Sequence, residues 1–400
     1  MLRCSTMLVV LMAGWLMAGG TAHAQIQVEA DYLIFNRVDS DSGRFITGPQ
    51  GLSGGNDYGF ASGYRFGVVG GYDLYEVEAL FSQVDGWTDN QTRVLTSGLS
   101  FDDASANAFV FPGGPANVIA FRNALFDAAT RSGAVGADET LEGELLQPGA
   151  IARLKSSSRY RDFELNFGTN RTTNWYRFGL GYRNIRLNDR TQFATIGTFD
   201  AIDVNDGAVS GGAGNDANDG LSDAALTAAG FQLTGGAADG YDAADVAGAG
   251  PDTLAVFYAG NADNELNGVQ AIAAAQLTQS EYFVIELVGK AGVYHNSVHA
   301  NTTEMLIGSG NDDSVYTRRF SDQKSTASFV GSLGLQARIP VTDYIVFTTG
   351  YEGIVLTGVA LGTQQFDGIH PTLMGTTVYS AKANDSAFLH GAKFGFELTF

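Results

Sequence analysis

Four histidines lie after residue 24 and are the side chains best suited to acid–base chemistry: His295, His299, His370 and His390. A Ser-His-Asp or Asp-His mechanism in this chain would have to use one of them. His295 and His299 are four residues apart, but in an extended segment this spacing does not form the one-face pair of helical metal motifs. We expect both to be ordinary interfacial histidines. The alternative is a surface metal site, or a catalytic histidine near Asp312 or Asp313. No phosphate-binding glycine loop, paired cysteines or nucleophile elbow stands in a fitting context, and we expect neither an enzyme nor a cofactor.

A second set of ionisable residues occupies the polar positions of alternating segments. Nine are acidic and six are basic: Glu29, Asp31, Glu76, Glu78, Asp162, Glu164, Glu286, Glu352 and Glu397, with Arg65, Arg177, Arg183, Lys290, Arg338 and Lys393. If the segments close into a barrel, these side chains share its interior. Buried charges persist mainly when paired, so the first interpretation is a closed, salt-bridged interior. A narrow pore with a mixed-charge constriction is the second interpretation, and a barrel opened by loop movement is the third.

Ten segments alternate apolar and polar residues with a period of two, which predicts strands long enough to cross a membrane. Tyr64, Phe66 and Val68, for example, oppose Gly63, Arg65 and Gly67. We place the strands near 26–37, 59–70, 74–85, 158–168, 173–187, 266–277, 281–296, 325–338, 343–358 and 387–400. Residues 92–101 and 191–199 could extend strands or add a hairpin, so twelve strands remain an alternative. The predicted fold is an all-β, transmembrane, antiparallel up-and-down barrel.

The connections between these segments alternate in length. Short ones follow every second strand, at 71–73, 169–172, 278–280 and 340–343, and long ones lie near 38–58, 86–157, 188–265, 297–324 and 359–386. This order is typical of an outer-membrane barrel with both termini in the periplasm and its long loops outside the cell. Within the long loops, residues 118–130 and 222–229 have helical spacing and predict helices that serve as a plug or as a surface cap.

The two ends of the chain predict export and membrane assembly. Arg3, the apolar run 7–20 and the sequence Ala22-His23-Ala24 are typical of a signal peptide cleaved after Ala24, which would remove the single cysteine, Cys4. At the other end, 388–400 alternates down to Phe400. Phe396, Leu398 and Phe400 are the expected signal for the barrel assembly machinery, and the apolar face is expected to contact outer-membrane lipid.

The C-terminal third resembles a bacterial β-barrel porin family, a group of outer-membrane β-barrel proteins. The resemblance rests on the strand patterns Gly289–Asn296, Phe329–Leu335, Gly350-Tyr351 with Gly358–Leu361, Phe388–Ala392, and Asn267–Gln270. It covers 266–400 and, more loosely, 26–85. The resemblance implies an outer-membrane barrel through which small solutes diffuse passively, and it supplies no catalytic residues.

The formal net charge is −20, which makes the chain a poor partner for nucleic acid. Residues 188–265 contain thirteen acidic residues and one basic residue, Arg190. Flexibility and self-repulsion explain such an acidic loop most simply. Weak calcium binding is the sharper alternative, since 211–216 matches most of one calcium-binding repeat and 39–43 carries oxygen ligands at short spacing. Beside a porin-like or structural role, the acidic loops leave open a surface adhesion protein that uses the barrel as an anchor.

Overall fold

The structure is a computed structural model of the chain. It describes residues 25–400 except 40–42, 49, 55–57, 73, 102–109, 112–113, 116, 120–140, 143, 171–174, 199–202, 205–219, 222, 229, 239–240, 243–252, 310–312 and 372–376. None of the helices that it describes is both long enough and apolar enough to cross a bilayer. The predicted signal peptide lies outside the described residues, as does the 211–216 calcium motif.

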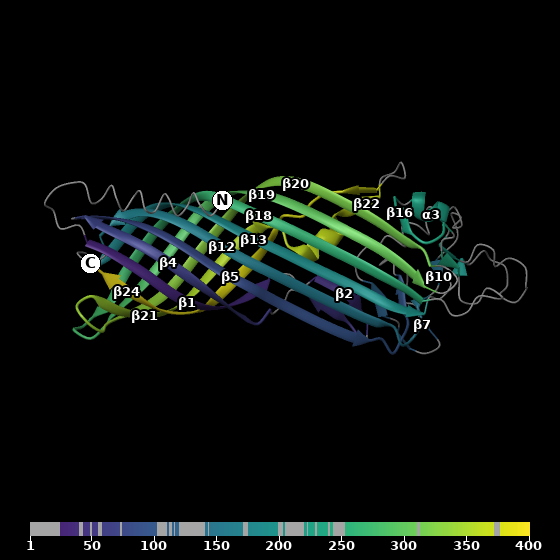
Figure 1. The fold of residues 1–400 in the computed structure, drawn as a ribbon, viewed down its shortest axis with the longest axis horizontal. Helices are drawn as coiled ribbons and strands as arrows, with labels where there is room; N and C mark the ends of the chain where they lie inside the picture. Colours follow the sequence, from purple (N-terminus) through teal and green to yellow (C-terminus); the bar gives the residue numbers. More distant parts are fainter. Residues whose placement is uncertain are drawn as a thin grey trace, which may run out of the picture.

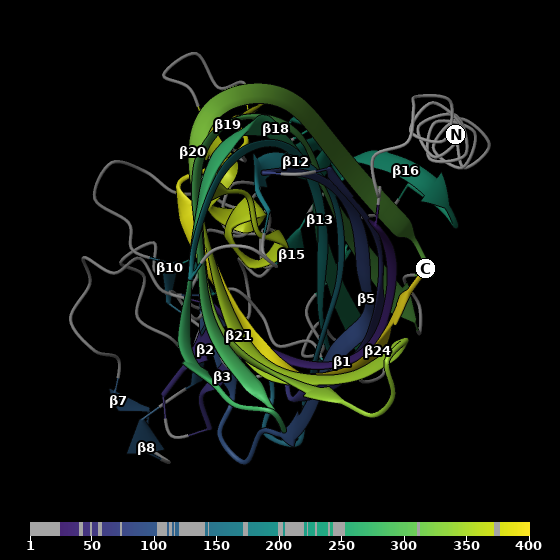
Figure 2. The same cartoon turned by 90° about the vertical axis from the view of Figure 1, so that its left-hand side faces the viewer.

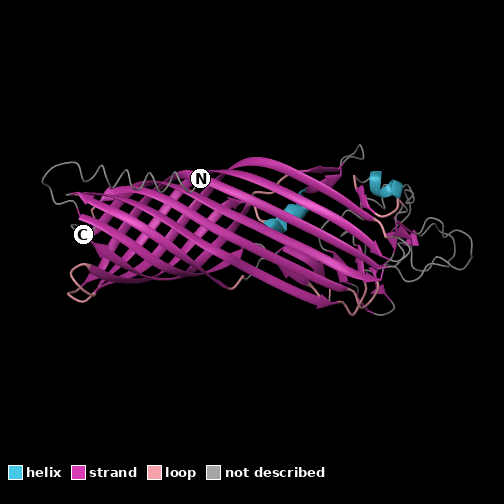
Figure 3. Ribbon diagram, viewed as in Figure 1, coloured by secondary structure: helices cyan, strands magenta, loops and turns pink. Residues whose placement is uncertain are grey.

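Ten long strands form one closed antiparallel barrel (Figures 1 and 3). They are β1 Gln25–Asp39, β4 Phe60–Tyr72, β5 Tyr75–Val94, β12 Ile151–Thr169, β13 Tyr176–Thr198, β18 Thr253–Gln279, β19 Val284–Ser309, β20 Val315–Pro340, β21 Ile345–Val359 and β24 Asp385–Thr399. Each pairs with its neighbour in the chain, and β1 pairs with β24 to close the ring. The predicted fold class and the count of ten strands are confirmed. A short strand, β16 (Gln232–Gly235), adds to β20 at the rim.

Several barrel strands are much longer than the membrane requires. β18 has 27 residues and β19 and β20 have 26 each, whereas about 9 to 11 residues cross a bilayer. The sequence analysis assigned the outer parts of these strands to loops, and that assignment is wrong for 253–265, 297–309 and 315–324. Alternation continues there, and many of the outward residues are polar, such as Asp263 on β18 and His299 on β19, as expected beyond the membrane. Residues 92–94 and 191–198 likewise extend β5 and β13 and add no hairpin to the barrel.

Outward-facing apolar residues form a belt around the end of the barrel that carries the short turns. Phe178, Leu180 and Val293 are 63%, 70% and 65% exposed, whereas inward Glu164 is 3% exposed. We call this belt the apolar band; it includes Val28, Tyr32, Phe66, Phe167, Phe178, Leu180, Val269, Val293, Leu333, Phe394, Phe396 and Leu398. Toward the long connections it gives way to Asn36 on β1, Arg161 on β12, Asn184 on β13 and His295 on β19. An apolar belt of this kind is the surface that a β-barrel presents to lipid.

The long connections carry the remaining elements. These are β2 Gly43–Thr47, β3 Leu52–Gly54, β6 Leu99–Phe101, β7 Val110–Phe111, β8 Gly114–Pro115, β9 Asn117–Ile119, β10 Leu141–Glu142, β11 Glu144–Leu146, β14 Asp203–Val204, β15 Gly220–Leu221, α3 Asp223–Ala228, β17 Tyr241–Asp242, η2 Gly362–Gly368, β22 Ile369–Pro371 and β23 Thr377–Tyr379. α3 matches the helix predicted at 222–229. The other predicted helix begins in strand β9 instead, and the rest of 118–130 lies outside the described residues.

Candidate functional site

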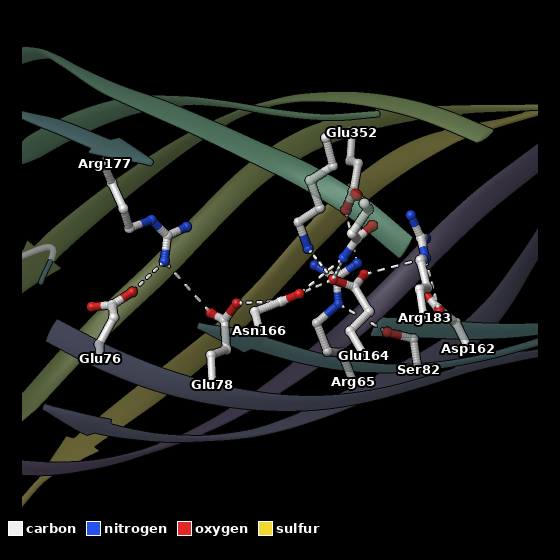
Figure 4. Close-up of polar contacts among 12 residues, drawn as sticks. Arg65, Glu76, Glu78, Ser82, Asp162, Glu164, Asn166, Arg177, Arg183 and Glu352 are labelled. Carbon is white, nitrogen blue, oxygen red and sulfur yellow. Dashed lines mark hydrogen bonds and ion pairs between the residues drawn. The ribbon is translucent and has the colours of Figure 1, made fainter. Parts of the chain in front are cut away.

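Charged side chains fill the part of the lumen that lies at the height of the apolar band (Figure 4). Arg177 of β13 lies against two carboxylates of β5, with Nη1 2.6 Å from Glu76 Oε1 and 3.8 Å from Glu78 Oε1. These glutamates are two residues apart on one strand, so both face inward. Asn166 of β12 donates to Glu78 Oε2 at 2.9 Å. The guanidinium therefore neutralises charge on a neighbouring wall of the barrel.

Arg183 is the most enclosed member of this network. Its Nε and Nη2 donate to the two carboxylate oxygens of Asp162 at 3.0 and 2.7 Å, and Nη2 also donates to Tyr160 Oη at 3.0 Å. The side chains of Arg183 and Asp162 are 1% and 2% exposed. Glu164 lies 3.5 Å from Arg183 Nε and accepts from Lys290 Nζ at 2.6 Å. Two cations thus face two carboxylates, an arrangement that allows every charge to remain buried.

Two further ion pairs close the network. Arg65 of β4 donates to Glu352 of β21 at 2.8 Å and to Ser82 Oγ at 3.0 Å. Nearer the short turns, Arg338 of β20 donates to Glu397 of β24, with Nε 3.1 Å from Oε2. Arg65 and Glu352 lie on strands that are not neighbours in the ring, so their contact spans the lumen.

A small cavity lies between these pairs. It measures about 50 Å³, and Glu29, Glu286, Lys290 and Lys393 are among the residues that line it. These 50 Å³ are the space open to the centres of water molecules, so the cavity has room for several ordered waters between the charged groups. Lys393 Nζ, on its edge, donates to Gln336 Oε1 at 2.7 Å.

All fifteen charged residues singled out in the sequence face the interior of the barrel. Twelve are buried and three are partly buried: Glu29, Asp31, Glu76, Glu78, Asp162, Glu164, Glu286, Glu352, Glu397, Arg65, Arg177 and Arg183, then Lys290, Arg338 and Lys393. Asp31 stands directly opposite Arg65 in the pairing of β1 with β4, and it accepts from Thr348 Oγ1 at 3.0 Å. The closed, salt-bridged interior, the first of the three interpretations, stays a prediction, to which these ion pairs are relevant.

Above the charged network the lumen contains an apolar layer that the sequence analysis did not foresee. Inward residues of several strands pack there as one buried cluster, which includes Leu33, Phe35, Leu187, Leu266 and Leu356. Trp87 joins it and donates Nε1–H to the Phe35 carbonyl at 2.8 Å. The sequence does contain a signal for this apolar layer: along each strand, the inward-facing positions change from charged to apolar residues toward the long connections.

A second buried cluster fills the outer half of the barrel, where the last long connection folds inward. The ring of Phe366, in η2, lies 5.4 Å from Phe45 of β2 and 6.2 Å from Tyr258 of β18, centroid to centroid. Gln365 Nε2 fixes the turn by donating to the carbonyls of Leu361 and Lys382 at 2.8 and 2.9 Å. In the end-on view, η2 lies inside the ring of strands (Figure 2). We call this cluster and η2 together the plug.

Between the two apolar clusters lies a buried cation with two acids. Arg37, 0% exposed, donates to Asp39 Oδ1 at 2.8 Å and to Asp189 Oδ1 at 2.5 Å, and its guanidinium lies over the Tyr58 ring. Asp39 is the last residue of β1, beyond the apolar band. Burial raises the pKa of Asp39 to about 7. The charge of Arg37 opposes this shift, and the charge of Asp189 adds to it. The sequence analysis interpreted 39–43 as possible calcium ligands and 188–265 as a flexible acidic loop, and it did not predict this cluster.

We expect the stability of the barrel to depend on pH through Asp39. Its folded pKa lies above its usual value of 3.8, so its contribution is complete below pH 4 and is lost as pH rises through about 7. Asp39→Asn should remove this loss and make the protein more stable than the unaltered chain at pH 8. Unfolding midpoints between pH 4 and pH 8 measure the effect, with the outward-facing Asp85→Asn as control. Parallel profiles for Asp39→Asn and the unaltered protein would contradict it.

The histidines do not form a catalytic or metal site among the described residues. His295 and His299 are exposed on the outer face of β19, and neither hydrogen-bonds a carboxylate of the described chain. His390, also outward, lies with Nδ1 2.5 Å from Tyr351 Oη. His370 belongs to β22. No group of three metal-binding side chains is found in the part of the chain that the structure describes.

Comparisons with known proteins return barrels of low similarity. No family model matches the sequence, and no curated protein matches it. The outer membrane protease OmpT from Escherichia coli is 10% identical over 96% of this chain and 99% of its own, with a TM-score of 0.38. The toluene transporter TodX from Pseudomonas putida is 7% identical over 96% of this chain and 92% of its own, with a TM-score of 0.24. An anion-selective porin from Comamonas acidovorans is 10% identical over 95% of this chain and 100% of its own, with a TM-score of 0.20.

These TM-scores carry no argument about function, and the porin-family resemblance remains a resemblance of strand patterns. Two features of the chain itself identify its class. The ten strands close without a free edge, and the apolar band surrounds the end that carries the short turns. The protein has the fold of a transmembrane, ten-stranded, up-and-down β-barrel of the outer-membrane type.

Proposed function

We propose that the protein is a closed outer-membrane barrel that anchors a rigid extension outside the cell. The observation that carries this proposal is the filling of the lumen by three successive layers: the ion-pair network, the apolar layer and the plug. Such an interior transmits no solute. The proposed role is therefore structural, with the long connections held away from the membrane as a surface for interaction.

The length of the strands supports this role. β18 continues for 14 residues from Asn267, at the edge of the apolar band, to Thr253. At about 3.3 Å per residue this is roughly 45 Å of strand beyond the membrane-facing part. A diffusion pore gains nothing from so long an extension, whereas a protein that presents its loops to partners does. The acidic connection within 188–265 would then lie at the far end of the extension, where it could also meet calcium ions.

Placement in the outer membrane follows from the two ends of the chain. Residues 1–24 would direct export and be cleaved after Ala24. Phe396 and Leu398 lie in the apolar band on β24, the strand that closes the ring, where the assembly machinery would engage the chain end through Phe400. The short turns would face the periplasm and the long connections the outside.

Passive diffusion of small solutes is the competing function, and conductance separates the two. Residues 25–400, refolded and inserted into a planar bilayer, should produce no steady unitary conductance. Replacement of 362–368 by a Gly-Ser linker should also leave the barrel silent, because the ion-pair network lies between the plug and the short turns. Co-flotation with liposomes and heat-modifiable migration establish that each protein has inserted. Reproducible ohmic steps from the unaltered protein would refute the closed barrel.

A further inference from the structure

Basic side chains gather on the outer face of two neighbouring strands, from the edge of the apolar band toward the long connections. They are Arg153, Lys155, Arg159 and Arg161 on β12, and Arg186 and Arg190 on β13. The chain has only 23 lysines and arginines and a net charge of −20, so six on one side of one hairpin are a strong concentration. We call these six the basic face; β12 and β13 run across the front of the barrel in Figure 1.

The basic face is only partly neutralised by the protein. Arg159 pairs with Asp85 at 2.7 Å and Arg186 with Glu265 at 2.8 Å, all four side chains being 42% to 54% exposed. The other four cations have no acidic partner among the described residues. The sheet register also sets Arg161 directly opposite Arg186, and like charges in this position repel. Arg161 Nε is buried without a hydrogen-bond partner in the described structure. A bound anion would relieve both costs.

The surface beside these cations is hollowed. An open pocket of about 390 Å³ lies on the outer wall, lined by Arg159, Arg190, Asn188, Asn261, Asp263 and Asn301 among others. Gly86 also borders the pocket, at a bulge of β5; it has φ +86°, and a side chain there would meet open space. The pocket joins two guanidinium groups to a row of amide and carboxylate groups. Arginine pairs with phosphate, and amides and carboxylates hydrogen-bond hydroxyl groups.

The end of the basic face nearest the apolar band, at Arg161 and Arg186, lies at the height of a lipid headgroup. On β12, Arg161 is the next outward residue after Phe163, so it lies about 7 Å further along the strand than the lipid-facing residue. The headgroup layer on each side of a bilayer is about 5 to 8 Å thick. Arg161 and Arg186 therefore lie level with lipid phosphates. Arg159, Arg190 and the pocket lie slightly above, where only a large headgroup reaches.

We propose that the basic face and its pocket bind the phosphorylated sugar headgroup of a glycolipid in the outer leaflet. The arginines hold the phosphate, and the side of the pocket formed by Asn188, Asn261 and Asn301 contacts the sugar hydroxyls. This inference rests on the proposed outer-membrane placement, with the long connections outside. It assigns a specific lipid partner to one side of the barrel and leaves the other side to unspecific lipid contact.

The test measures the binding of different lipids to the refolded barrel in detergent micelles. Bisphosphorylated lipid A should bind saturably, as measured by native mass spectrometry, and should raise the unfolding midpoint of the barrel. Arg161→Gln with Arg190→Gln should weaken binding at least tenfold, since a hydrogen bond to a charged group contributes on the order of tenfold each. Arg319→Gln with Lys382→Gln, which removes two cations outside the basic face, should leave it unchanged. Equal loss in this control pair would overturn the proposal.

Three further probes separate the possible sources of the anion. Dephosphorylated lipid A should bind at least tenfold more weakly, and neither phosphatidylglycerol nor free inorganic phosphate should compete at equal concentration. Competition by phosphatidylglycerol would mean a general anionic belt, and competition by phosphate alone a simple anion site; either result overturns the glycolipid assignment. Conductance and liposome flotation do not depend on the basic face, so failure here is distinguishable from failure of the closed barrel.

Discussion

Replacing Arg183 by alanine should lower the free energy of unfolding by about 3–5 kcal/mol, the usual loss when one partner of a buried pair is removed. Lys290 stays beside Glu164, at 2.6 Å, but Asp162 loses both of its guanidinium hydrogen bonds. A carboxylate with only the Tyr160 hydroxyl as donor would then lie in an interior where its side chain is 2% exposed. Urea unfolding in vesicles, followed by the fluorescence of buried Trp87, measures the change.

Two companion variants show that the cost comes from burial of an unpaired charge. Arg186→Ala, on the outer face of the same strand, removes a pair with Glu265 whose side chains are 44% exposed, and should change stability by less than about 1 kcal/mol. Arg183→Met with Asp162→Leu removes both buried charges and should recover most of the loss. If Arg183→Ala cost no more than Arg186→Ala, the ion-pair network would not be a structural element of the lumen.

Replacing Phe366 by alanine should weaken the plug by about 3–5 kcal/mol, the range for truncating a buried phenylalanine. The ring is 1% exposed and contacts Phe45 and Tyr258, so its loss leaves a cavity between η2 and the barrel wall. Because residues 25–400 contain no cysteine, a single Thr302→Cys reporter can be followed without background. Thr302 is 0% exposed and donates to the Gln365 carbonyl at 3.4 Å.

In this reporter background, Phe366→Ala should raise the rate of maleimide labelling on the order of 100-fold or more, since local opening becomes cheaper by the packing energy lost. Val378→Ala lies in the same connection, but its side chain is 47% exposed, so it should leave the rate within about twofold. Rapid labelling of the reporter with Phe366 intact would mean that the plug is already open in solution.

The sequence predicted those parts of the barrel that depend on local alternation. Tyr176 to Arg183 shows why: the outward apolar and inward polar residues of β13 alternate without a break, and a period of two is a property of each strand alone. The charged interior followed from the same alternation, because parity determines which side of the wall a residue occupies. Pairing partners, such as Arg65 with Glu352, are 287 residues apart and could not be assigned from parity.

The interior above the charged network depends on contacts that no local pattern encodes. Phe366 lies in a connection of mixed composition, and its burial arises only because Phe45 and Tyr258 converge on it from distant parts of the chain. Arg37 and Asp189 are 152 residues apart and were read as parts of a strand and of an acidic loop. The outer halves of β18 and β19 were missed because the expected strand length was taken from the bilayer, whereas these strands continue beyond it.

The pairing of β1 with β24 has a consequence for biogenesis. The first strand finds one of its two neighbours only when Asp385–Thr399 has been synthesised, so the ring cannot close before the last strand is available. Arg338 lacks Glu397 until then, and β21 lacks its second neighbour. Closure of the ring is therefore a single late event, and a chain truncated before residue 385 would leave the edges of β1 and β21 unpaired.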